Sequence, residues 1–185
     1  KRGLLVVFSG PSGSGKGTVL KEALKKSDNL EISVSVTTRA PREGEVDGVD
    51  YIFYSNEQFK ELVSNNGFLE WACFCENYYG TPKEFVLDKL SSKDVILEID
   101  VNGGLNVKKN YPNALLIMIL PPSKEELKNR LIKRSTESLE KIELRMQRIE
   151  YELGKKDLYD YAVVNDDLKE TILKIENIIK TAKNG

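Results

Sequence analysis

A glycine-rich segment near the start of the chain constrains the fold most, because it lies between an apolar run and an amphipathic run. Residues 4–9 indicate a buried strand, residues 10–18 read GPSGSGKGT, and a helical pattern follows as far as Leu24. A strand that leads through several glycines into a helix is the setting that the P-loop pattern requires. Glycine backbone N–H groups and the positive end of the helix dipole both attract phosphate oxygens. We therefore expect a phosphate site here, with Lys16 reaching the outer phosphates. The alternative is a turn with an exposed lysine.

The residue that follows Lys16 bears on magnesium. A strict P-loop has Ser or Thr at that place to bind Mg²⁺, whereas this chain has Gly17 and then Thr18. We therefore expect Mg²⁺ to accompany a nucleotide with water and phosphates as most of its ligands, and we name no certain protein ligand. Glu98 and Asp100 end an apolar strand expected over residues 94–100 and alternate to one side of it. One of them could help to place the ion, and the alternative is an exposed acidic strand end.

The rest of the chain alternates strand-like and helix-like segments, which predicts an α/β fold with a mostly parallel sheet flanked by helices. Further strands are expected over residues 32–36, 51–54, 68–74, 115–120 and 161–164. Capping patterns predict helices that begin after Ser55, Thr81, Ser123 and Asp167. Two segments interrupt the alternation, so we expect one domain with a core (1–33, 85–123 and 158–185), an inserted lobe (34–84) and a helical lid (124–157).

Composition excludes several classes of function. The 185 residues include 28 basic and 29 acidic side chains, no histidine and two cysteines. Without histidine, no His base or His metal ligand is available. Near-zero net charge argues against a nucleic-acid coat protein, and it leaves open a local basic cleft. Two cysteines, Cys73 and Cys75, are too few for a zinc site, and we expect both thiols and Trp71 to be buried. No apolar run approaches the ~20 residues of a membrane span and no signal-peptide pattern is visible, so we expect a cytoplasmic protein.

Arginines gather in three places that suit phosphate groups. Arg39 and Arg42 lie in one loop, Arg130 and Arg134 share a helix face at i and i+4, and Arg145 lies on the next helix with Arg148. Guanidinium groups bind phosphates bidentately, and the alternative is a set of solvated arginines paired with nearby Glu. No catalytic base is evident. None is needed if the acceptor is itself an ionised phosphate.

These residues together resemble the guanylate kinase family over essentially the whole chain. The resemblance rests on GPSGSGKGT (10–18), on TTRAPREGE (37–45) with Gly48, Asp50, Tyr51 and Phe53, and on EW (70–71), NYYGT (77–81), EID (98–100) and VNDD (164–167). It implies a P-loop NTPase-type sheet, and the reaction ATP + GMP giving ADP + GDP with Mg²⁺. The lobe at 34–84 would then bind GMP. The resemblance further implies ATP and GMP as the only partners, with no nucleic acid or membrane, and a monomer.

The resemblance also implies roles for individual residues. ATP would be held by Gly10, Ser12, Gly13, Ser14, Gly15, Lys16, Gly17 and Thr18, with Asn165 near the adenine. The GMP phosphate would be held by Arg39, Arg42, Tyr51 and Tyr79, and the guanine read by Ser35, Glu70, Thr81 and Asp100, with Glu45, Gly80 and Glu98 in the same site. The catalytic set would be Lys16, Arg42, Arg130, Arg134 and Arg145.

Guanine chemistry agrees with that assignment, because guanine N1–H and its exocyclic amine are adjacent donors and a carboxylate such as Glu70 accepts both. Two other functions stay open. One is a non-catalytic guanylate-kinase-like scaffold domain that binds peptides. The other is a kinase for a different nucleoside monophosphate.

Overall fold

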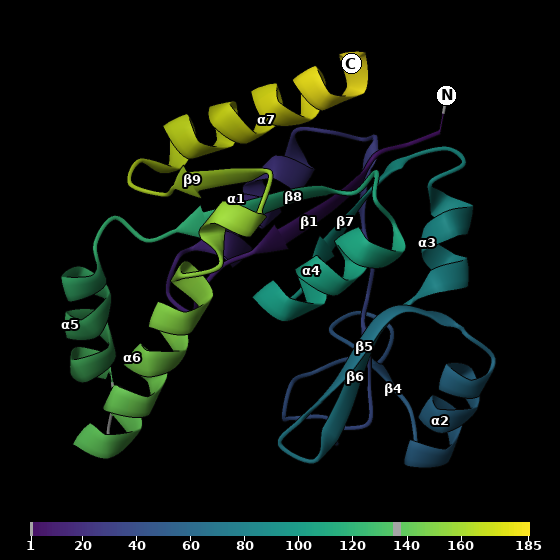
Figure 1. The fold of residues 1–185 in the computed structure, drawn as a ribbon, viewed down its shortest axis with the longest axis horizontal. Helices are drawn as coiled ribbons and strands as arrows, with labels where there is room; N and C mark the ends of the chain where they lie inside the picture. Colours follow the sequence, from purple (N-terminus) through teal and green to yellow (C-terminus); the bar gives the residue numbers. More distant parts are fainter. Residues whose placement is uncertain (1, 135–137) are drawn as a thin grey trace. The chain divides into compact units, whose positions relative to one another are not determined.

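The computed structural model describes residues 2–134 and 138–185, which form an α/β fold with two sheets (Figure 1). The five-stranded sheet has the order β2-β7-β1-β8-β9, and the four-stranded sheet has the order β4-β3-β6-β5. The strands are β1 Leu5–Ser9, β2 Leu30–Ile32, β3 Val36–Thr37, β4 Ile52–Phe53, β5 Phe68–Phe74, β6 Asn77–Pro82, β7 Asp94–Glu98, β8 Leu115–Leu120 and β9 Tyr161–Val164. The helices are α1 Lys16–Lys25, α2 Asn56–Ser64, α3 Lys83–Lys89, α4 Val101–Asn110, α5 Lys124–Arg134, α6 Leu139–Leu153, the 3₁₀ turn η1 Lys156–Leu158 and α7 Leu168–Asn184.

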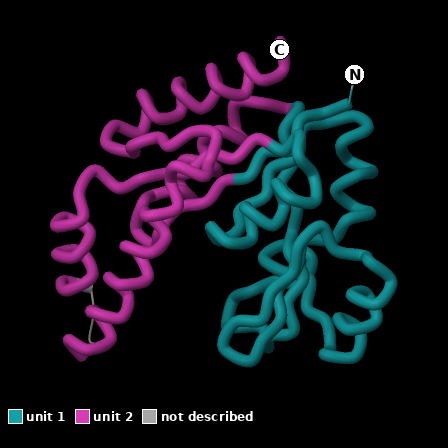
Figure 2. Tube along the Cα trace, in the orientation of Figure 1, with its two compact units in different colours: residues 1–7, 29–114 teal, residues 8–28, 115–185 magenta. Residues whose placement is uncertain are grey.

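The chain divides into two compact units (Figure 2). One comprises residues 1–7 and 29–114, and the other residues 8–28 and 115–185, so the boundary falls within β1. The predicted division into core, lobe and lid follows other boundaries and stays a prediction.

The predicted parallel sheet flanked by helices is confirmed. In the first unit β2 pairs with β7 in parallel, and in the second β8 pairs with β9 in parallel. Every residue of β1 is buried, because a parallel strand covered on both faces reads as a continuous apolar run. Helices α1 and α7 contact each other in the second unit, and each buries an apolar face. Among the described residues, no helix combines the length and apolar character that a bilayer crossing demands.

The strand predicted over residues 32–36 is wrong, because it is two strands in two sheets. Leu30–Ile32 pairs with β7, whereas Val36–Thr37 pairs with β4 and β6 in the smaller sheet. The alternating apolar residues Ile32, Val34 and Val36 continue across the change of sheet. Periodicity reports that a residue faces an apolar layer and does not report which strand is its partner.

The helix signals were correct in three places and wrong in one. Ser55 and Gln58 form both halves of a capping box, and the side chains of Ser123 and Asp167 accept from backbone N–H groups at the starts of their helices. Thr81 caps no helix: it belongs to β6, and Pro82 is the N-cap of α3 without a side-chain cap bond. Thr81 is unavailable for capping because its hydroxyl donates to Glu70 Oε1 at 2.9 Å.

Burial was also mispredicted at the end of β5. Cys73 and Cys75 are both exposed, and Trp71 is 44% exposed. The apolar cluster of the smaller sheet instead forms around Val36, Phe59 and Phe68, with the Phe59 and Phe68 rings stacked at 4.4 Å. Trp71 only borders this cluster, with its ring 6.2 Å from that of Phe59.

The packing around Phe68 leads to a stability prediction at Gly80. An added Cβ at Gly80 would lie 2.6 Å from Phe68 Cδ1 and 2.7 Å from Cε1, and Phe68 is itself 5% exposed. We expect Gly80→Ala to lower the free energy of unfolding by about 1–3 kcal/mol, because an overpacked core strains its neighbours. Urea unfolding measures this. Gly154→Ala, where the added Cβ is no closer than 3.3 Å to its neighbours, serves as the control and should change stability by less than about 0.5 kcal/mol. Equal effects of the two substitutions would contradict the steric explanation.

Candidate active site

The glycine-rich loop leads from β1 into α1, as the sequence predicted. Helix α1 begins at Lys16 and its N-cap is Gly15, which has φ 81° and makes no side-chain capping bond. The first turn carries no acidic residue. The N–H groups at the start of a helix are orphan donors, and with no carboxylate beside them they suit an anion.

One side chain from a later part of the second unit and one from the end of the loop itself hold this loop. Asn165 Nδ2 donates to the Ser14 carbonyl at 3.0 Å, and an added Cβ at Gly15 would lie 2.4 Å from the same nitrogen. The left-handed φ and this close approach together require glycine at position 15. Lys16 Nζ donates to the Gly10 carbonyl at 2.8 Å.

The Ser14 hydroxyl adds a spare polar group to the loop. Its oxygen is buried, and within the described part of the chain it has no hydrogen-bond partner. Together with the amides it makes a donor set of the kind that phosphate oxygens accept. Ser12, Gly13, Gly17 and Thr18 lie on the exposed surface of this segment, and Gly10 is buried.

Arg130 on α5 and Arg145 and Arg148 on α6 are exposed. The Arg130 guanidinium pairs with Glu126 one turn earlier on α5, and Arg145 lies on the exposed face of α6. The side chain of Arg134 lies outside the described residues. Pairing with a nearby Glu is the arrangement that the solvated alternative predicted for Arg130. An exposed i,i+4 pair of this kind contributes little to stability, so the guanidinium can exchange partners at low cost.

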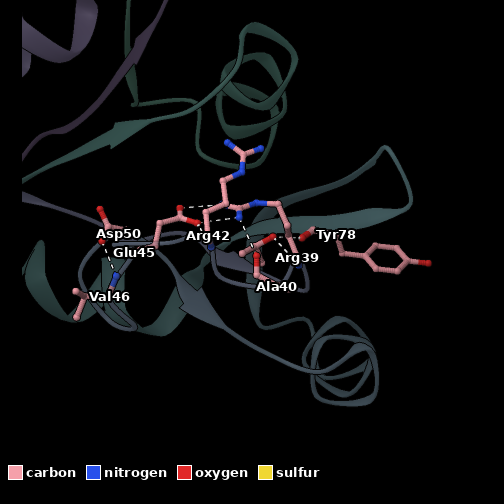
Figure 3. Close-up of polar contacts among 8 residues, drawn as sticks. Arg39, Ala40, Arg42, Glu45, Val46, Asp50 and Tyr78 are labelled. Carbon is pink, nitrogen blue, oxygen red and sulfur yellow. Dashed lines mark hydrogen bonds and ion pairs between the residues drawn. The ribbon is translucent and has the colours of Figure 1, made fainter.

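In the first unit, the loop that follows β3 holds Arg39 in a fixed position (Figure 3). Its guanidinium makes two bonds to the Glu45 carboxylate, each of 2.8 Å, and Glu45 Oε1 also accepts from the Arg42 backbone N–H at 2.7 Å. These bonds lower the pKa of Glu45 to about 2 and raise the pKa of Arg39. Glu45 and Arg39 are therefore both charged at any physiological pH. The Arg42 side chain, in contrast to that of Arg39, is exposed.

Two tyrosines lie beside Arg39. The guanidinium carbon lies 5.3 Å from the centre of the Tyr51 ring, and the Tyr51 and Tyr79 rings meet edge to face at 6.2 Å. Tyr79 also contributes to the raised pKa of Arg39. Arg39, Arg42, Glu45, Tyr51 and Tyr79 are thus brought together as one cationic and phenolic cluster, whose donors are of the kind that bind a phosphate.

Glu70 is a buried carboxyl of the first unit with a raised pKa. It is 9% exposed, its Oε1 accepts from the Thr81 hydroxyl, and its Oε2 lies near the Gly103 backbone, where an added Cβ would be 3.3 Å away. Burial raises the pKa of Glu70 to about 7, the Thr81 bond opposes that rise, and the charge of Asp100 adds to it. A buried carboxyl with a raised pKa in a polar site is a functional candidate.

A β-bulge gives Glu70 its direction. Phe68 pairs with Pro82 and Glu70 pairs with Thr81, so β5 has one more residue than β6 at this point. Pro82 and Thr81 are neighbours and face opposite sides, and cross-strand partners share a face. Phe68 therefore faces α2, while Glu70 faces the side that carries Thr81 and Tyr79.

Of the remaining predicted residues, Asp100 lies close enough to Glu70 for its charge to act on that carboxyl. Asp100 is the N-cap of α4, with Oδ1 accepting from Gly103 N–H at 2.7 Å, and β7 ends at Glu98. The expectation that Glu98 and Asp100 alternate along one strand is therefore wrong, because the strand ends between them. Glu98 is exposed, and the Ser35 carbonyl accepts from Ile52 N–H. Gly80 and Thr81 are buried in β6.

The sequence analysis did not predict helix α4. It therefore also missed Gly103 and Asn110, the two residues of this helix that contact β5 at the site. Gly103 and Gly104 in its first turn have low helix propensity and hid the helix. Asn110 at its end donates to the Leu69 carbonyl at 2.7 Å. The signal that could have found the helix start is Asp100, an acceptable N-cap.

The side chains of the described residues bear on how magnesium could bind. In the described ranges 2–134 and 138–185, no group of three or more His, Cys, Asp or Glu could hold a metal ion. A Mg²⁺ that enters with a nucleotide and keeps phosphate and water as most of its ligands needs no such group.

Comparison with known proteins gives one consistent result. The family model described as guanylate kinase matches residues 2–182. The guanylate kinase of Caldanaerobacter subterraneus is 51% identical over 184 residues, covering 99% of this chain and 89% of the relative. That of Clostridium tetani is 52% identical over 184 residues, covering 99% and 88%. The crystal structure of guanylate kinase from Anaplasma phagocytophilum is similar, with a TM-score of 0.76 and 34% identity over 97% of this chain and 86% of that one.

The raised pKa of Glu70 leads to a prediction about pH and stability. The folded carboxyl binds its proton up to about pH 7, whereas the ordinary value is 4.5, so this residue's contribution is fully present below pH 4.5 and is lost as pH rises through 7. Glu70→Gln cannot ionise. We expect the free energy of unfolding of this variant, relative to that of the wild type, to rise by up to about 3 kcal/mol between pH 4.5 and pH 8. Urea unfolding of both proteins across this range measures the difference. Parallel curves would show that Glu70 titrates normally.

Proposed function

The chain belongs to the guanylate kinase family, and we propose that it transfers the terminal phosphoryl group of ATP to GMP, with ADP and GDP as products. The observation that carries the proposal is the buried Glu70 carboxyl beside the Thr81 hydroxyl. A carboxylate in that position accepts hydrogen bonds from guanine N1–H and from the exocyclic amine. Adenine has an acceptor at N1, so it would face the carboxylate without a proton between them. A site built on hydrogen bonds rejects such a mismatch strongly.

The phosphate of GMP would bind at the cluster of Arg39, Arg42, Tyr51 and Tyr79. Glu45 holds the Arg39 fork in place, so the donors are arranged before the substrate arrives. Preorganised donors lose less conformational entropy on binding. Arg42, which is exposed, is the arginine best able to turn toward an incoming phosphate.

ATP would bind at the glycine-rich loop. The uncapped start of α1, the Ser14 hydroxyl and Lys16 supply donors for its phosphates. Asn165, proposed from the resemblance to lie near the adenine, holds the Ser14 carbonyl, so a role in shaping the loop is supported as well.

The transfer itself needs position and charge rather than a base. The acceptor oxygen of GMP is already ionised, so no proton has to be removed. Mg²⁺ bound with ATP supplies charge neutralisation at the phosphates. Arg130, Arg134 and Arg145 would stabilise the transferring group, and Arg130 would exchange Glu126 for it. We further propose a cytoplasmic monomer with no nucleic-acid or membrane partner.

Two alternatives differ from this proposal in measurable ways. A peptide-binding scaffold domain would have no use for the phosphate loop. The hydrogen bonds that Lys16 and Asn165 make within this loop support the enzyme. A kinase for another nucleoside monophosphate would not place a buried carboxyl where guanine offers two donors.

A nucleotide panel tests the function. With ATP and Mg²⁺, and AMP, CMP, UMP or GMP as acceptor, we expect turnover with GMP and at least about 10⁴-fold lower kcat/KM with AMP. A coupled assay for ADP release measures it. Lys16→Ala is the control and should lose about 10²-fold or more of kcat, because one preorganised cation at the developing charge is removed. Wild-type activity no greater than that of Lys16→Ala would favour the scaffold.

The pH dependence of GMP use tests the role of Glu70. Guanine donates to the ionised carboxyl, and the pKa of Glu70 is about 7, so we expect the KM for GMP to rise about tenfold from pH 7.5 to pH 6 while the KM for ATP changes less. GMP phosphate itself titrates near pH ~6. Glu70→Gln provides the baseline for that titration, and should show only the change that comes from the phosphate. If the KM for GMP depended on pH identically in the wild type and in Glu70→Gln, Glu70 would have no role in binding guanine.

A further inference from the structure

Leu69, the residue next to Glu70, is the extra residue of the bulge in β5. The β5–β6 register passes from Phe68 opposite Pro82 to Glu70 opposite Thr81 and leaves Leu69 out. Leu69 is 3% exposed. A bulge interrupts the ladder, so its backbone groups need other partners, and a buried carbonyl without one is costly. β5 is also the last strand of its sheet, so no further strand can provide that partner.

Asn110 provides it from another element. Its side-chain Nδ2, at the last residue of α4, donates to the Leu69 carbonyl at 2.7 Å across 41 positions of sequence. The other end of the same helix reaches the Glu70 side chain, because Gly103 in the first turn lies beside Glu70 Oε2. Helix α4 therefore contacts the bulge at its backbone and at its side chain.

The direction of the Glu70 side chain depends on this bulge. In a regular strand Phe68 and Glu70 would share a face. Phe68 is buried against Phe59, so without the extra residue Glu70 would face the apolar cluster and not Thr81. Whatever holds the bulge in register therefore also fixes where the carboxyl is aimed.

We propose that Asn110 is a positioning residue for guanine recognition, which holds the bulge at Leu69 and so keeps the Glu70 carboxyl directed to the Thr81 side of the sheet. The proposal rests on the proposed function, since it concerns how the guanine-reading residue is placed. Asn110 itself need not touch the substrate.

The side chains around Asn110 offer a matched control. A cavity of about 240 Å³ is lined by Asn110, by Asn106 one turn earlier on α4, and by residues 68–71 of β5. Both asparagines are exposed. Asn110→Asp keeps the shape but replaces the donor by an acceptor opposite the Leu69 carbonyl. Asn106→Asp introduces the same charge into the same cavity.

The test compares GMP with IMP, which lacks the exocyclic amine that Glu70 would accept. We expect Asn110→Asp to lower the GMP-to-IMP ratio of kcat/KM about tenfold, the usual effect of one misplaced buried hydrogen bond, with the KM for ATP within about twofold of the wild type. Asn106→Asp should leave the ratio within about twofold. Asn110→Gln, which keeps an amide donor, should retain more of the ratio than Asn110→Asp.

Three results would overturn the positioning role: an unchanged ratio in a folded Asn110→Asp protein, equal losses in both Asp variants, or a loss of activity with no change in ratio. Thermal unfolding of each variant identifies a folding defect, and in that case the milder Asn110→Gln carries the comparison. Calorimetric binding of GMP and IMP to the wild type separates the two proposals. Selective GMP binding without turnover would overturn the proposed function and leave the positioning role to be judged on the binding ratio. No preference for GMP would overturn both.

Discussion

Burial of the Glu70 carboxyl is the constraint on which the proposed GMP site depends. Burial and the nearby charge of Asp100 disfavour the ionised carboxyl, and the hydrogen bond from the Thr81 hydroxyl offsets them only in part. A group in that state gains most from a ligand that brings two donors. The same feature that costs stability in the folded protein above neutral pH would, in the proposed function, give selectivity for a purine with adjacent N–H groups.

The two proposed phosphate sites differ in the kind of donor that they offer. In the second unit the donors belong to the backbone at the start of α1, where Gly15 permits a conformation that side chains would obstruct. In the first unit the donors belong to side chains, and Arg39 needs Glu45 and Tyr51 around it to stay in one rotamer. Backbone donors are stiff by construction, whereas a long side chain must be held by partners.

How much could be predicted from sequence depended on whether the signal was local. The glycine-rich loop, β8, β9 and the capping of α2 follow from neighbouring residues, and all were predicted. The bulge in β5 was not, because an extra residue in a strand shows only against its partner strand. Thr81 reads equally well as a helix cap and as a strand residue, and the Glu70 carboxyl decides between them. Cys73, Cys75 and Trp71 lie at an exposed strand end that apolar composition does not reveal. Site residues supplied by the family resemblance, such as Asn165, remain proposals.

The hydrogen bond from Lys16 to the Gly10 carbonyl has a consequence for the energetics of ATP binding. The ammonium bridges the start and the end of the loop, so the lysine acts as an internal brace. A phosphate that attracts this ammonium exchanges one oxygen partner for another and does not capture a freely moving side chain. The net gain from the attraction between Lys16 and the nucleotide is thus reduced by the loss of the bond to Gly10. The loop already has its closed shape in the folded protein before nucleotide binds. We expect such a loop to bind nucleotide with somewhat lower affinity but with faster association and dissociation, because the loop rearranges little.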